Sequence, residues 1–164
     1  MFPISINKGL DKKAYKFLVC AMGPIVLAID DDRSSQILMR AHLEDVQFCS
    51  EFIGKSNGRD ALSYLQDLIV APSPNLPDLI LLDIHMPEMS GWEFLDAIAP
   101  IMEKYTPSPV IVLLSATNTV DDIERAKNHP AILDITTKPI SNEYLNFLKQ
   151  REELSDLFAK SAEY

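Results

Sequence analysis

Cysteine is scarce in this chain of 164 residues, where only Cys20 and Cys49 occur. The two lie far apart, form no CxxC motif and have no nearby histidine at a metal-binding spacing. A structural zinc site needs four ligands, so these residues do not predict one. We instead expect reduced thiols with a structural role, which indicates a reducing compartment, and we place the protein in the cytoplasm.

Runs of basic residues and long apolar runs are also missing. The formal net charge is −9, and no cluster of lysine or arginine forms a stripe, which argues against direct nucleic-acid binding. No apolar stretch approaches the ~20 residues needed to cross a bilayer, so we expect no membrane association. The sequence contains no repeat and no low-complexity segment, and its length suits one ordinary domain with a proper core.

A secretion signal is only faintly suggested near the N-terminus. Lys12, Lys13 and Lys16 precede an apolar stretch over residues 17–22. This stretch is shorter than the apolar core of a signal peptide, and no cleavage site of small residues follows it. We therefore expect residues 1–23 to form a flexible leader ahead of the domain.

One phosphate-binding motif is incomplete. Residues Gly54-Lys55-Ser56 look like the end of a P-loop, but the first glycine of that motif would fall at Cys49. Without that glycine the backbone cannot form the phosphate cradle, so the sequence does not predict a P-loop.

What the sequence does contain is a regular alternation of apolar runs and amphipathic segments. The apolar runs are bounded by breakers, as in strands buried on both faces of a parallel sheet. The predicted strands cover residues 24–29, 47–53, 79–82, 110–114 and 132–137. The predicted helices cover residues 33–46, 59–68, 92–102, 118–128 and a single C-terminal segment from Ser141 to beyond Phe158.

This alternation of strands and helices through short connections predicts an α/β fold, a doubly wound parallel sheet with helices on both faces. The proline-rich segment at residues 71–77 is too short to separate two domains. We therefore expect one domain over residues 24–150, followed at 151–164 by the end of the C-terminal helix and a tail.

Polar side chains follow four of the predicted strands, at the edge where ligands bind in open α/β sheets. They are Asp30 with Asp31, Asp83, Ser115 and Lys138. Three carboxylates brought together repel one another and favour a hard cation such as Mg²⁺, which also coordinates phosphate oxygens. A lysine and a hydroxyl supply the countercharge and the hydrogen bond that a phosphoryl group needs. The pattern predicts that Asp83 is a nucleophile for phosphorus that forms an acyl phosphate.

These motifs resemble the receiver domain of two-component response regulators. The resemblance rests on Ile-Asp-Asp-Asp at residues 29–32, Leu-Leu-Asp-Ile-His-Met-Pro-Glu-Met-Ser-Gly at 81–91, Leu-Leu-Ser-Ala at 113–116 and Thr-Lys-Pro at 137–139. It covers about residues 24–148. It implies a flavodoxin-like fold with five helices and five parallel strands in the order 2-1-3-4-5.

The resemblance also implies a metal site. Asp83 corresponds to the phosphoacceptor, and Asp31 and Asp83 correspond to the direct Mg²⁺ ligands. The backbone carbonyl of His85 is implied as a further ligand, and Asp30 is implied to act through water. Asp32 is left as the cap of the helix that follows.

Ser115 corresponds to the hydroxyl residue that responds to phosphorylation, and Lys138 to the lysine that binds the phosphoryl group. The implied function is to accept a phosphoryl group from a sensor histidine kinase or a phosphotransfer protein. This would switch protein–protein interactions with a downstream target that the sequence does not identify. We expect a stand-alone signalling receiver that catalyses only its own phosphorylation and dephosphorylation, rather than an enzyme.

Three positions depart from the pattern or need comment. Members of the family usually carry Tyr or Phe three residues before the lysine, where this chain has Ile135. This puts in doubt the coupling of an aromatic side chain to phosphorylation. The side chain of His85 either influences the lifetime of the acyl phosphate or is a solvated loop histidine. We expect His42, on the first predicted helix, to be a surface residue.

Two other functions remain as alternatives. Asp30 and Asp32 also resemble the nucleophile and acid/base of haloacid-dehalogenase-type phosphatases, with Ser115 and Lys138 as later motifs, but Asp83 would then have no role. No acidic pair follows Lys138 at the end of a further predicted strand, and the sequence offers no cap domain. The second alternative is an interaction module of the same fold that is not phosphorylated.

Overall fold

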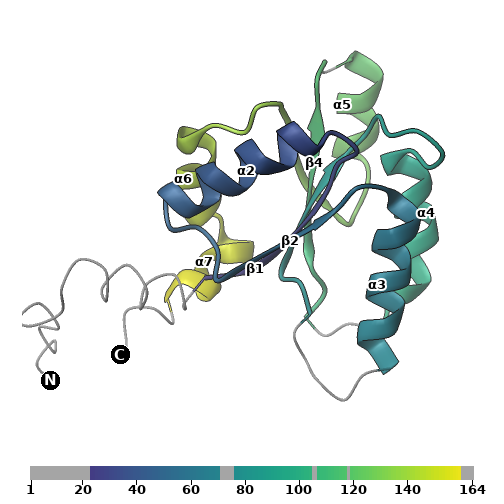
Figure 1. The fold of residues 1–164 in the computed structure, drawn as a ribbon, viewed down its shortest axis with the longest axis horizontal. Coiled ribbons are helices and arrows are strands. Elements are labelled where there is room, and N and C mark those ends of the chain that lie inside the picture. Colours follow the sequence, from purple (N-terminus) through teal and green to yellow (C-terminus); the bar gives the residue numbers. More distant parts are fainter. Residues whose placement is uncertain (1–22, 71–75, 105–106, 118, 160–164) are drawn as a thin grey trace, which may run out of the picture.

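The computed structural model (Figure 1) describes residues 23–70, 76–104, 107–117 and 119–159. Within these ranges the chain forms five strands, each followed by a helix, and a sixth helix at the end. The strands are β1 (Ile25–Ile29), β2 (Glu51–Lys55), β3 (Leu79–Asp83), β4 (Val110–Ser115) and β5 (Ile132–Thr137). The helices are α2 (Arg33–Asp45), α3 (Gly58–Val70), α4 (Gly91–Met102), α5 (Val120–Lys127), α6 (Asn142–Lys149) and α7 (Glu152–Ala159).

All five strands form one parallel sheet in the order β2-β1-β3-β4-β5. The predicted fold class and strand order are therefore confirmed. The central strand β3 is buried along its whole length, whereas the edge strands β2 and β5 are only half-buried. This difference follows from composition, because Leu79–Leu82 is continuously apolar while β5 contains Asp134 and two threonines.

The helices cover both faces of the sheet. Side chains at alternate positions of each strand point to opposite faces, so Leu27 and Val26 of β1 belong to two different apolar clusters. Helices α3, α4 and α5 pack on the Leu27 side, and α2, α6 and α7 pack on the Val26 side. Figure 1 shows the two sets of helices on either side of the sheet.

Side-chain caps fix where several helices begin. Asp32 accepts a hydrogen bond from the backbone N–H of Ser34 and is the N-cap of α2, as predicted. Ser90 and Glu93 form a reciprocal capping box at the start of α4. Thr119 and Ser141 cap α5 and α6, because their hydroxyl groups accept the backbone N–H of Asp122 and Tyr144 respectively.

The predicted second strand, at residues 47–53, was placed too early. Gln47 has a positive φ of 51°, which turns the chain after α2, and the strand begins only at Glu51. Phe48 and Cys49 are buried from the connecting loop, where they fill the core on the α2 side. Their apolar character therefore reflects packing rather than strand pairing.

The predicted single C-terminal helix is in fact two helices. α6 ends at Lys149, Gln150 is its C-cap, and α7 begins at Glu152. The break turns the chain so that Leu154 of α7 is completely buried in the cluster that also contains Leu148. The domain limits proposed from the sequence, 24–150, leave α7 outside, although α7 packs onto the same core.

Two further expectations concern the N-terminal leader and membrane-spanning helices. The predicted flexible leader, residues 1–23, falls almost entirely outside the described residues. None of the helices in the described part of the chain is long and apolar enough to span a membrane.

Candidate phosphoryl-transfer site

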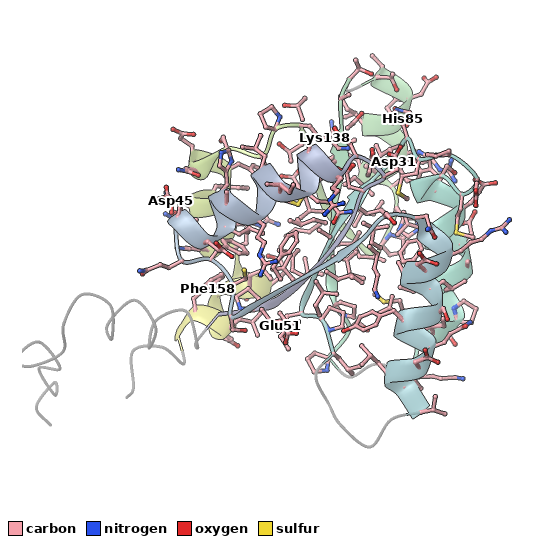
Figure 2. The ribbon with its side chains drawn as sticks, viewed as in Figure 1. Asp31, Asp45, Glu51, His85, Lys138 and Phe158 are labelled. Atoms are coloured by element: carbon pink, nitrogen blue, oxygen red, sulfur yellow. The ribbon has the colours of Figure 1, made fainter. Side chains whose placement is uncertain are left out.

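Four strands deliver polar side chains to one edge of the sheet. Asp30 directly follows β1, Asp83 and Ser115 are the last residues of β3 and β4, and Lys138 directly follows β5. All four strands are parallel, so these ends lie at the same edge. Figure 2 shows Asp31 and Lys138 at this end of the sheet.

Lys138 joins the two buried carboxylates of the site. Its Nζ lies 2.6 Å from Asp30 Oδ2 and 2.7 Å from Asp83 Oδ2. Asp30 is completely buried and Asp83 is nearly so, and the Lys138 side chain is only 17% exposed. Buried ions in this arrangement stabilise one another, because removing one would leave an unpaired charge in a medium of low polarity.

The site shifts the proton affinity of both members of the Lys138–Asp83 pair. Burial raises the pKa of Asp83, and the hydrogen bonds from Lys138 and His85 offset this only in part. Burial alone would lower the pKa of Lys138, but the hydrogen bonds and charges of Asp30 and Asp83 outweigh it and raise the pKa. Lys138 therefore stays protonated and keeps its positive charge next to Asp83.

Asp30 is held in place by its own surroundings. Ser35 Oγ donates to Asp30 Oδ2 at 2.7 Å, and the backbone N–H of Asp32 donates to Asp30 Oδ1 at 2.9 Å. Gln36 Nε2 donates to two carbonyl oxygens, those of Asp30 at 2.7 Å and Lys55 at 3.0 Å. Sequence reasoning missed Ser35 and Gln36, because polar residues in the first turns of a helix are common and carry no local signal of such contacts.

Three of the predicted metal ligands come together. Carboxylate oxygens of Asp30, Asp31 and Asp83 all lie within 4.8 Å of one another, with Asp31 exposed and the other two buried. This is the only such group of His, Cys, Asp or Glu side chains found within the described ranges. A set of carboxylate oxygens open to solvent on one side suits a hard divalent cation that keeps some of its water ligands.

The loop after β3 is shaped by a close approach at Gly91. A Cβ atom at this position would lie 2.5 Å from the carbonyl oxygen of Asp83 and 2.9 Å from Cα of Ile84. The Gly91 N–H donates to the Ile84 carbonyl at 2.9 Å, which brings the start of α4 back to the end of β3. Only glycine allows this approach, so the Ser-Gly pair fixes the loop beside Asp83.

His85, in this loop, contacts Asp83 through its backbone. The His85 N–H donates to Asp83 Oδ1 at 3.0 Å and so helps to orient the carboxylate. The imidazole is exposed and points toward α5, where its Nε2 lies 3.9 Å from Asp122 Oδ2. That the His85 carbonyl oxygen binds a metal stays a prediction.

Ser115 lies at the site, but its hydroxyl is engaged elsewhere. Ser115 is completely buried, and its Oγ donates to the carbonyl oxygen of Thr117 at 2.6 Å. The same Oγ accepts the Thr117 N–H at 3.2 Å. The hydroxyl is therefore committed to its own loop in this conformation.

Two further positions can now be compared with their predictions. His42 is not a plain surface residue, because it is half-buried and its Nδ1 lies 2.7 Å from the carbonyl oxygen of Ile140. This contact ties α2 to the segment that follows Lys138. Ile135 is half-buried on β5, opposite Leu113 of β4, and packs against the core.

Comparisons with known proteins agree with this geometry. The family model described as a response regulator receiver domain matches residues 26–147. The sensor histidine kinase CheAY of Helicobacter pylori is 30% identical over 128 residues, which are 77% of this chain but only 15% of that protein. The probable methanogenesis regulatory protein FilR2 of Methanothrix harundinacea is 32% identical over 122 residues, 74% of this chain and 76% of that protein.

The solved structures give the same result. The crystal structure of a two-component response regulator from Cytophaga hutchinsonii is 26% identical, with a TM-score of 0.66. The similarity covers 83% of this chain and 94% of that one.

Proposed function

The chain belongs to the response regulator receiver family, and from this premise we propose that Asp83 is its phosphoacceptor. Receivers of this family accept phosphoryl groups in two-component signalling. The observation that carries the proposal is the position of Asp83, at the end of the central strand and 2.7 Å from the ammonium of Lys138. A nucleophilic carboxylate next to a fixed positive charge is the arrangement that phosphoryl transfer requires.

The proposed step is transfer of a phosphoryl group from a histidine of the donor to Asp83. An oxygen of Asp83 attacks the phosphorus of a phosphorylated histidine, a new P–O bond forms, and the P–N bond breaks. The imidazole of the donor leaves with the electron pair of that bond and takes up a proton. Lys138 offsets the negative charge that builds up on the phosphoryl oxygens, and the His85 N–H holds the attacking carboxylate in place.

We propose Mg²⁺ as the cation of this site. Asp31 and Asp83 would bind it directly, Asp30 through water, and the carbonyl of His85 would complete the protein ligands. This proposal is supported by the carboxylate oxygens of Asp30, Asp31 and Asp83, which lie within 4.8 Å of one another. The bound ion would supply charge neutralisation for the transferring phosphoryl group.

A sensor histidine kinase or a phosphotransfer protein is the proposed donor, and the phosphorylated form is proposed to act through a change in protein–protein contacts. The catalysis that we assign to the chain is limited to transfer and hydrolysis at Asp83. A cytoplasmic location fits these partners and belongs to the same proposal.

A haloacid-dehalogenase-type phosphatase is not favoured. That reading requires Asp32 as an acid/base, whereas the Asp32 carboxylate caps α2 through Ser34. It also leaves Asp83 without a role, although Asp83 is paired with Lys138 at the centre of the site.

The experiment is labelling with acetyl phosphate and Mg²⁺, read on a gel that retards phosphoproteins. We expect one shifted band that disappears with EDTA and in Asp83→Asn, but persists in the matched control Asp96→Asn, whose side chain is exposed on α4. A band that survives in Asp83→Asn would disprove the assignment. No band in the wild-type protein with either acetyl phosphate or a histidine kinase would favour the interaction module that is not phosphorylated.

A further inference from the structure

Asp122, near the start of α5, is a meeting point for side chains from three parts of the chain. Its Oδ2 accepts a hydrogen bond from Thr119 Oγ1 at 2.6 Å, and its Oδ1 accepts one from Trp92 Nε1 of α4 at 3.1 Å. His85, in the loop after β3, places Nε2 3.9 Å from Asp122 Oδ2. Although α5 is a polar surface helix, the Asp122 side chain is only 13% exposed.

The charges around Asp122 fit an ionised carboxylate. The hydrogen bond from Thr119 is the largest cause that lowers the pKa of Asp122, and the Trp92 bond and the charges of His85 and Arg125 act in the same direction. Arg125, one turn further along α5, places its guanidinium 4.1 Å from the centre of the Trp92 ring. α5 therefore contacts Trp92 of α4 twice, through the hydrogen bond to Asp122 and through the cation–π contact of Arg125.

This junction is connected to Asp83 in two ways. One is through His85, whose backbone N–H bonds Asp83 while its ring faces Asp122. The other is through β4, where Leu114 pairs with Asp83 of β3, and which ends four residues before Thr119, the cap of α5. Asp122 therefore lies at the far end of both connections.

In the conformation that contains the Asp122 contacts, the Ser115 hydroxyl does not point to Asp83 but bonds Thr117. The Ser115 hydroxyl donates to Thr117, so it must break that bond before it can donate to a phosphoryl group on Asp83. Moving the hydroxyl away also gives up the bond that it accepts from the Thr117 N–H, and this releases the start of the segment between β4 and α5. That segment is anchored at its far end by Thr119 and Asp122.

We propose that Asp122 is a positioning residue that holds α5 and the β4–α5 segment in the arrangement described here and so opposes the rearrangement that phosphorylation of Asp83 induces. The inference rests on the proposed function of Asp83. It follows from linkage, because contacts made only in one of two conformations shift the population toward that conformation. A ligand that selects the other conformation then binds with a lower apparent affinity.

The test measures binding of beryllofluoride, a mimic of the phosphoryl group, to the full chain in excess Mg²⁺ by ¹⁹F NMR. Trp92→Phe removes one hydrogen bond to Asp122 but keeps an aromatic ring, and Asp122→Ala removes the whole junction. Asp121→Asn is the matched control, since Asp121 is an exposed acid in the same turn of α5. Because one hydrogen bond is worth about two- to tenfold in an equilibrium, we expect Trp92→Phe to bind about two- to tenfold more tightly than the control. Asp122→Ala, which loses more contacts, should bind at least as tightly as Trp92→Phe.

Hydrogen exchange of the α5 amides gives a second readout. Without beryllofluoride, exchange over residues 120–127 should be faster in both variants than in Asp121→Asn. Tighter binding separates positioning from general damage, because a loss of stability alone does not raise affinity for a ligand.

Equal or weaker binding by Trp92→Phe would overturn the proposal, and this variant decides the matter if Asp122→Ala does not fold. A wild-type protein that binds no beryllofluoride would instead count against the function proposed for Asp83. The two failures are therefore distinguishable.

Discussion

The hydroxyl of Ser115 and the carbonyl oxygen of Thr117 lie 2.6 Å apart. A serine hydroxyl has one hydrogen to donate, so Ser115 cannot hold Thr117 and a phosphoryl group at the same time. Ser115 can therefore donate to a phosphoryl group on Asp83 only after it releases Thr117, whereas Lys138 already contacts Asp83.

Ser115→Ala should leave phosphorylation of Asp83 largely intact and reduce the response to it. The alanine can neither hold Thr117 nor donate to the phosphoryl group, so a hydroxyl bond worth about 0.5–1.5 kcal/mol no longer distinguishes the two conformations. Labelling by acetyl phosphate should proceed at a near-normal rate. The change in α5 hydrogen exchange on adding beryllofluoride should shrink, whereas Ser115→Thr, which keeps the hydroxyl, should preserve it. A full response in Ser115→Ala would show that another group carries the signal.

Lys138→Ala should slow labelling by about 10²-fold, because it removes the charge that stabilises the transferring phosphoryl group. It should also destabilise the fold at low Mg²⁺, since Asp30 and Asp83 then lose their partner. A cation at the same carboxylates relieves this repulsion, so Mg²⁺ should raise the melting temperature of Lys138→Ala more than that of the wild type. Lys127→Ala, an exposed lysine at the end of α5, is the control. Equal effects of the two substitutions would contradict the role of Lys138.

Gly91→Ala should destabilise the protein by about 1–3 kcal/mol, because the new methyl group meets backbone atoms of Asp83 and Ile84 that cannot move freely. Gly58→Ala makes a matched comparison. Gly58 also begins a helix, but a Cβ there meets the flexible side chain of Met89 at 2.7 Å, which can shift. In the absence of a clash, glycine to alanine in a helix stabilises. Urea unfolding of both variants measures the difference, and equal stabilities would refute the close approach at Gly91.

Tyr144→Phe should cost stability at neutral pH and less at high pH. The Tyr144 hydroxyl donates to Asp134 Oδ2 at 2.9 Å, and burial, followed by the charge of Asp134, raises the pKa of Tyr144 well above 10.0. The folded state thus keeps a proton that the unfolded state releases above about pH 10, and the stability from this tyrosine is lost as pH rises from there toward the folded-state pKa. Urea unfolding at pH 8 and pH 11 should show a gap of about 1–2 kcal/mol that narrows at the higher pH. A gap that is constant or grows would contradict this linkage.

The parts of the fold that could be predicted are those whose signal is local. Apolar runs that end on Asp30, Asp83, Ser115 and Lys138 predicted both the strands and the edge at which the site lies, because a parallel sheet places all carboxyl ends together. The cap at Asp32 followed from the same local reasoning. The family resemblance supplied the strand order, which local pattern alone does not determine.

The parts that could not be predicted depend on contacts between distant residues. At Asp122, the contacts with Trp92 and His85 join side chains 30 or more positions apart in sequence, and no spacing rule predicts them. No Gly or Pro lies between α6 and α7, so the apolar pattern predicted one continuous helix. In the sequence His42 is indistinguishable from other polar residues of a surface helix, because its partner, the Ile140 carbonyl, lies 98 positions away.

The packing of α7 has a consequence for modularity. The family match ends at residue 147, yet Leu154 is completely buried and the Phe158 ring packs edge-on against Phe48, 5.1 Å between ring centres. The apolar surface around Phe48 is thus covered by a helix that the family match leaves out. The hydrophobic core of this chain therefore extends beyond the residues that the family model matches. A graft of the receiver onto another protein has to carry α7 with it.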